Sequence, residues 1–145
     1  MMRMGLAAAT ALLAMSPNAT AETEFNFAGQ WTFEAMIQSD CTFGGTAFFE
    51  RVEGDAFAGE LTARQSCASL PEDYLVRQDC KATVFGNQVS VRCTIVEFVN
   101  GFESEYYFPD NFSLTVAEPD RLYGVLVSFG PTNPAEWRRA EGSIS

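Results

Sequence analysis

The residues best suited to specific chemistry in this chain are its four cysteines. They are separated by 25, 12 and 12 residues, so the C-x-x-C pair of a zinc knuckle or of a redox motif is missing. The chain also has no histidine, which removes the usual companion of cysteine in a zinc site and the usual general base. The spacing therefore favours structural disulfides over a metal centre. The cysteines are Cys41, Cys67, Cys80 and Cys93.

Two turn signals limit how these cysteines pair, although four cysteines allow three connectivities. Gly54, in the middle of residues 53–55, predicts a three-residue turn, and Gly86-Asn87 predicts a two-residue turn. Counting outward from each turn places two cysteines opposite one another, and the second pair falls on a rung where side chains lie closest. We therefore predict the disulfides Cys41–Cys67 and Cys80–Cys93.

Carboxylates are the other side chains that could do chemistry. Glycosidic acid–base chemistry uses a pair of carboxylates, and Glu103 and Glu105 lie two residues apart on one predicted strand face, but that face is the exposed one. The chain has no Gly-x-Ser-x-Gly elbow, phosphate loop or histidine triad. Asp110-Asn111 and Glu118-x-Asp120 carry oxygen ligands, but not in the order of a known calcium loop. We predict no catalytic residue, no metal site and no cofactor.

The charge balance narrows the class of partner. The formal net charge is −10 at pH 7, which argues against nucleic acid or an anionic membrane surface, because both depend on a basic patch. A basic partner and a cation stay open, and so does a role in solubility alone.

The first 21 residues predict a signal peptide. Arg3 precedes a short apolar run, and Ala19-Thr20-Ala21 has the pattern of a cleavage site. The apolar run is shorter than the roughly 20 residues that span a bilayer. We expect cleavage after Ala21, a single domain over residues 22–145, and a periplasmic or secreted location without a membrane span.

The remaining chain predicts eight antiparallel strands, each next to its neighbour in sequence. Eight such strands close most simply into an up-and-down barrel, which leaves no free edge. Residues 66–78 are expected to be irregular, as a lid over one mouth or as a crossover. Asn133 and Pro134 are expected to start a short C-terminal helical turn that carries Trp137. The expected strands are 31–38, 42–51, 56–65, 79–85, 88–99, 102–108, 112–118 and 121–129.

The predicted register also places one face of the sheet in the barrel interior. This face is apolar, apart from Glu97, which could bind a ligand or lie at the open rim in water. Its members are Ala82, Val84, Val89, Val91, Cys93, Ile95, Val99, Phe102, Tyr106 and Phe108. The residues that we expect to face a ligand are Phe43, Phe49, Ile95, Glu97, Tyr106 and Phe108.

A motif at the start of the first strand resembles that of a known barrel family. Phe27-Ala28-Gly29-Gln30-Trp31 is similar to the Gly-x-Trp motif of calycin-type barrels, which include the lipocalins and avidins. The resemblance implies that Trp31 closes one barrel end and stacks on an arginine beyond the last strand. Arg138 and Arg139, next to Trp137, are the candidates, and the choice between them stays open.

A second resemblance concerns the small periplasmic barrels that inhibit secreted metalloproteases. They share an early Gly-Gln-Trp and a nearby disulfide, but their inhibitory tail begins with small residues, whereas this chain would begin Glu22-Thr23-Glu24.

Two functions are therefore in play. The first is an exported, non-catalytic barrel that binds a small apolar or aromatic ligand, a hypothesis motivated by Trp31 and by 13 phenylalanines. The alternative is a periplasmic protein-interaction or protease-inhibitor-like barrel, whose partner is another exported protein.

Overall fold

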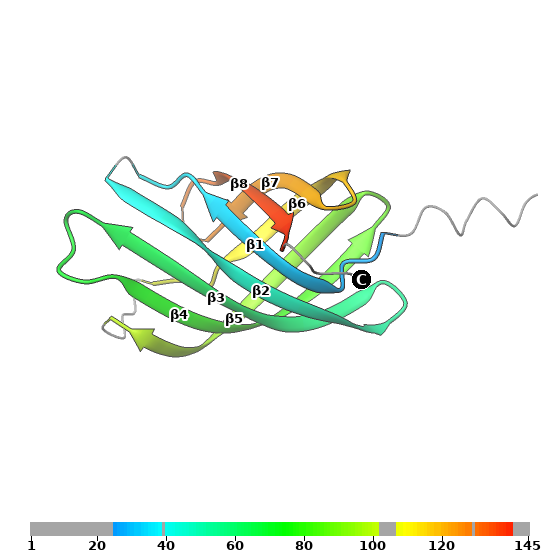
Figure 1. Cartoon of the computed structure of the whole chain (residues 1–145), viewed down its shortest axis with the longest axis horizontal. Coiled ribbons are helices and arrows are strands. Elements are labelled where there is room, and N and C mark those ends of the chain that lie inside the picture. Colours follow the sequence, from blue (N-terminus) through cyan, green and yellow to red (C-terminus); the bar gives the residue numbers. More distant parts are fainter. Residues whose placement is uncertain (1–24, 39, 102–106, 129, 141–145) are drawn as a thin grey trace, which may run out of the picture.

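The computed structural model is an all-β closed barrel of eight antiparallel strands (Figure 1). It describes residues 25–38, 40–101, 107–128 and 130–140, and these contain no helix. No helix in this part of the chain is long and apolar enough to cross a membrane. The strands are β1 (Gly29–Ala35), β2 (Cys41–Glu53), β3 (Ala56–Cys67), β4 (Tyr74–Phe85), β5 (Gln88–Asn100), β6 (Asn111–Glu118), β7 (Arg121–Val127) and β8 (Asn133–Arg139).

Each strand pairs with its neighbours in sequence, and β8 returns to pair with β1. The turns before β3 and β5 lie where the sequence predicts them, and Gly54 and Gly86 have φ values of 52° and 63°, which only glycine adopts without strain. The resulting registers place Cys41 opposite Cys67 and Cys80 opposite Cys93. Both pairs form disulfides, as the counting from the turns predicts.

The C-terminal helical turn is wrong, because residues 133–139 form strand β8. This strand pairs with β7 on one side and with β1 on the other, where Trp137 lies opposite Phe33. Alternate side chains, those of Ala135 and Trp137, are buried in the barrel. The local helix-start signal is thus outweighed by two ladders of hydrogen bonds and by burial of an indole.

The prediction of eight strands is right, but one of the eight is a different segment of the chain. Of the strand expected at 102–108, residues 102–106 lie outside the described residues, and Tyr107 and Phe108 are not in a strand. The next strand, β6, pairs directly with β5. The segment expected to be irregular over 66–78 shrinks to 68–73, because pairing between β3 and β4 continues outward to Gln65 and Tyr74.

The inward placement of Glu97 is also wrong, because β5 contains two register shifts relative to β4. Gln78 pairs with Ile95 but Arg77 pairs with Glu97, so one extra residue reverses which side chains face the interior. Glu97 lies on the outer surface, where its Oε1 is 3.0 Å from Nη2 of Arg77. Val99, also expected inside, is 51% exposed.

Candidate ligand site at the open mouth of the barrel

The two ends of the barrel are connected differently. At one end the strands join through two-residue turns at 54–55, 86–87 and 119–120. At the other end more residues separate consecutive strands, at 36–40, 68–73, 101–110 and 128–132, of which 39, 102–106 and 129 lie outside the described residues; we call these the long connections. The arrowheads of β1, β3 and β5 point toward this second end, on the left of Figure 1. Long loops commonly carry binding residues, so the end with the long connections is the better candidate for a site.

The end with tight turns is filled by aromatic side chains. Trp31 is fully buried, stacks on Phe27 with 5.2 Å between ring centroids, and donates its indole N–H to the Phe27 carbonyl. Trp137 is fully buried and stacks on Phe33 at 5.2 Å. Its Nε1 has no hydrogen-bond partner, the one such buried side-chain atom among the described residues. From this end a continuous aromatic cluster extends into the barrel interior, and its members are Phe27, Trp31, Phe33, Phe49, Phe57, Phe112 and Trp137.

Arg139 covers this aromatic cluster. Its guanidinium carbon lies 4.3 Å from the centre of the Trp31 ring, and burial lowers the pKa of the group. It donates hydrogen bonds to three backbone carbonyls, those of Asn26, Ala28 and Pro119. Arg138 instead points to the surface and binds Glu136 at 2.7 Å. The arginine that meets Trp31 is therefore Arg139.

The opposite end holds an open pocket of about 510 Å³. All four long connections contribute to its wall, through Ile37, Leu70, Phe108 and Pro131 among others. The wall combines apolar and aromatic side chains with polar groups that present about as much of its surface, among them three amides, a serine hydroxyl and one carboxylate. Its residues are Ile37, Gln38, Phe43, Gln65, Leu70, Tyr74, Tyr107, Phe108, Asp110, Leu126, Ser128, Pro131 and Asn133.

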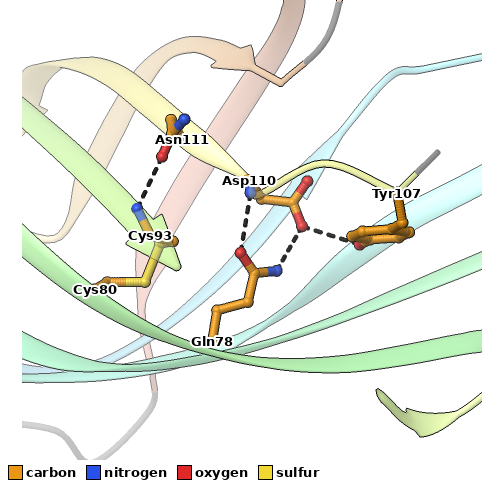
Figure 2. Close-up of a disulfide and its surroundings, with 6 residues drawn as sticks. All are labelled: Gln78, Cys80, Cys93, Tyr107, Asp110 and Asn111. Atoms are coloured by element: carbon orange, nitrogen blue, oxygen red, sulfur yellow. Dashed lines mark hydrogen bonds between the residues drawn. A yellow bond between two sulfur atoms is a disulfide. The ribbon is translucent and has the colours of Figure 1, made fainter. Parts of the chain in front are cut away.

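The carboxylate, Asp110, is held by a small buried network (Figure 2). Gln78, on β4, donates its Nε2–H to Oδ2 of Asp110 at 2.7 Å and accepts the Asp110 backbone N–H at 2.9 Å. The Tyr107 hydroxyl donates to the same Oδ2 at 2.9 Å. Gln78 is fully buried and Asp110 is 2% exposed. The network fixes the segment before β6 against the interior face of β4.

Burial dominates the electrostatics of this network. It raises the pKa of Asp110 to about 6, although the hydrogen bonds from Gln78 and Tyr107 oppose the shift by stabilising the carboxylate. Burial, together with the negative charge of Asp110, raises the pKa of Tyr107 well above its usual range. The phenol therefore remains a hydrogen-bond donor, and Asp110 is mostly ionised at neutral pH.

Neighbouring groups hold this corner of the mouth in place. Tyr107 packs against Tyr74 and Phe98, with ring centroids 5.5 and 5.7 Å apart. Asn111, which follows Asp110, accepts the backbone N–H of Cys93 at 2.8 Å and so ties β6 to the Cys80–Cys93 disulfide (Figure 2).

Comparison with known proteins supports the fold and goes no further. No family model and no curated protein matches this chain. The similar solved structures include a de novo designed fluorescence-activating β-barrel, with a TM-score of 0.57 and 14% identity over 79% of this chain and 94% of that one. Another is the redesigned barrel mFAP1 bound to DFHBI, with a TM-score of 0.55 and 12% identity over 78% and 94%. At these identities the likeness concerns architecture alone.

The residues expected to face a ligand are divided by the structure. Phe43 and Phe108 line the pocket. Phe49 lies in the filled end, 4.8 Å from the Phe27 ring, and Ile95 is half-buried opposite Gln78. Glu97 is on the outer surface. Tyr106 lies outside the described residues.

Sequence reasoning missed the polar centre of this pocket. It assigned Gln78 to an irregular segment and considered Asp110 only as an oxygen ligand for calcium. The sequence does contain a signal for Gln78. Val84, Ala82 and Cys80 alternate on the buried face of β4, and the same alternation reaches Gln78 two residues toward the N-terminus. No comparable signal marks Asp110, which lies outside any strand.

Proposed function

We propose that this protein is a non-catalytic barrel that binds one small apolar or aromatic molecule in its open mouth. The observation that carries the proposal is the pocket of about 510 Å³ lined by all four long connections. Ligand sites commonly have volumes of about 300–1,000 Å³, apolar walls and a few well-placed polar groups. This pocket has such a volume, and eight of its thirteen wall residues are apolar or aromatic, beside the fixed polar group of Asp110.

The contrast with the other end supports the proposal. Phe27, Trp31 and Trp137 fill that end, and Arg139 covers it, so the mouth is the entrance for a ligand. Two of the similar designed barrels hold DFHBI, so an eight-stranded barrel of this kind is able to accommodate a small molecule. The proposal does not depend on their residues.

We further propose that the protein is exported after removal of residues 1–21. Two disulfides suit an oxidising location outside the cytoplasm. The contact of Arg139 with Trp31 supports the calycin-type resemblance, in which an arginine from the end of the chain stacks on the first-strand tryptophan. The mass of the protein recovered from the periplasm or the medium tests the cleavage after Ala21.

Uptake of the neutral fluorescent probe N-phenyl-1-naphthylamine tests the binding function. We expect saturable, blue-shifted fluorescence at one site per chain. The variant Leu70→Trp places an indole in the pocket and should weaken uptake about tenfold or more, since the pocket space is then occupied.

The matched control is Val52→Trp, which adds the same side chain at an exposed position near the filled end. It should leave uptake unchanged. Absence of saturable uptake by the folded protein, or equal effects of the two variants, would overturn the proposal and favour an interaction protein instead.

A further inference from the structure

We infer that the ligand is a small aromatic or apolar amine, whose cationic nitrogen binds the carboxylate of Asp110. The inference rests on the proposed function and names the chemical class of the ligand. It depends on three features of the pocket: an unused carboxylate oxygen, the absence of a protein cation beside it, and aromatic side chains close by.

The first feature is that the two carboxylate oxygens of Asp110 differ in their hydrogen bonds. Oδ2 accepts both side-chain hydrogen bonds, from Gln78 and from Tyr107, while Oδ1 accepts none in the described part of the chain. Figure 2 shows Oδ1 directed away from both donors. Because Oδ1 has no partner among the described residues and is absent from the fully buried unpaired atoms, it retains some exposed surface, and Asp110 lines the pocket. This oxygen is therefore the one available to a ligand.

The second feature is that, in the described part of the chain, no lysine or arginine lines the pocket beside this charge. Arg64 on β3 and Arg77 on β4 have other partners, because Arg64 binds Asp73 and Arg77 binds Glu60 and Glu97 on the outer surface. A buried carboxylate without a countercharge is costly, and burial accordingly raises the pKa of Asp110 to about 6. A ligand cation would remove this cost, whereas a ligand anion would add to it.

The third feature is the aromatic surroundings. Tyr107 joins Asp110 directly to the ring cluster with Tyr74, and Phe43 and Phe108 line the same pocket. Aromatic faces attract organic cations as well as apolar groups. A ligand with an ammonium group and an apolar or aromatic body therefore matches both parts of the site.

Three naphthalene compounds of nearly equal size test the inference. They are 1-naphthylmethylamine, which is cationic at neutral pH, the uncharged 1-naphthalenemethanol, and 1-naphthoate, which is anionic. Each is titrated as a competitor of N-phenyl-1-naphthylamine. We expect the amine to bind about tenfold or more tightly than the alcohol, and the carboxylate to bind most weakly, because a buried charge is strongly discriminated.

The variant Asp110→Asn should weaken amine binding about tenfold or more while changing alcohol binding less than about threefold. An asparagine oxygen accepts the same bonds from Gln78 and Tyr107, so the network is retained. Asp79→Asn is the matched control. It removes the same charge from an exposed position on β4, and should leave the binding of both compounds unchanged.

The outcomes separate this inference from the function on which it rests. If neither the fluorescent probe nor any naphthalene compound binds, the proposed function itself fails. If the probe and the alcohol bind but the amine binds no better, the amine inference alone is overturned. Equal effects of the two asparagine variants would also overturn it, because the preference would then reflect the net charge of −10 and not Asp110. If Asp110→Asn does not fold, the wild-type competition repeated at about 1 M salt makes the same distinction, because salt screens exposed charges far more than a buried carboxylate, and loss of the amine preference there would overturn the inference.

Discussion

The two ends of this barrel differ in packing and in charge, although the same eight strands form both. At the end with short turns Trp31 packs against Phe27 and Trp137, and Arg139 lies over Trp31, with three bonds from its guanidinium to backbone carbonyls. The mouth instead has long connections, an open pocket and a carboxylate without a countercharge. Dense packing stabilises the first end, whereas the second contains a buried charge that burial alone would not favour. The residues that stabilise the fold and those of the candidate site therefore lie at opposite ends of the barrel.

The largest effect is expected from emptying the filled end. Trp31→Ala removes a fully buried indole that contacts Phe27, Trp137 and Arg139, and should lower the free energy of unfolding by roughly 3–5 kcal/mol. Leu70→Ala at the mouth should cost less than about 1.5 kcal/mol, because Leu70 is half-buried in an open pocket. Urea denaturation measures both, and equal losses would break the contrast.

The disulfides should contribute about 3 kcal/mol each, since they close loops of 26 and 13 residues. Chain entropy alone makes Cys41–Cys67, the longer loop, slightly more stabilising. Cys80 and Cys93 are buried, however, so replacing them with alanine also removes core contacts. We expect the Cys80–Cys93 double variant to be the less stable one in urea denaturation. The reverse order would indicate that loop entropy outweighs burial here.

The pH dependence of stability should reveal the charge at the mouth. The pKa of Asp110 is about 6 in the folded protein, against an ordinary value of 3.8, so the folded chain binds this proton more tightly than the unfolded chain. Stability should therefore fall as pH rises from about 4 to above 6, by on the order of 3 kcal/mol. Asp110→Asn should lack this component. Identical pH profiles of unfolding free energy in the two proteins would contradict the assignment.

A variant of Arg139 tests whether this side chain stabilises the filled end. Arg139→Ala removes three bonds to backbone carbonyls and the contact with Trp31, and should cost about 2 kcal/mol. Arg138→Ala is the matched neighbour, since Arg138 is exposed and binds only Glu136 among the described residues, and should cost less than about 1 kcal/mol. Thermal unfolding of both variants gives the comparison. A larger effect at Arg138 would contradict the role of Arg139.

Much of the fold was predictable where the determinants lie close together in sequence. Gly54 and Gly86 set the turns, the turns set the registers, and the registers place both cysteine pairs opposite one another. The same counting failed beyond Ile95, because a bulge in β5 reverses the inward and outward faces and moves Glu97 to the surface. A bulge depends on how the sheet curves to close, and no turn residue marks its position in the sequence.

Turn residues, strand alternation and cysteine spacing were enough to specify an all-β barrel with two particular disulfides. The tertiary structure, in contrast, makes residues 133–139 the strand that completes the barrel, because closure provides two ladders of hydrogen bonds that are not part of the local helix signal. It also decided the candidate site. Gln78 and Asp110 are 32 residues apart in the chain, and they meet only once the barrel has closed around them.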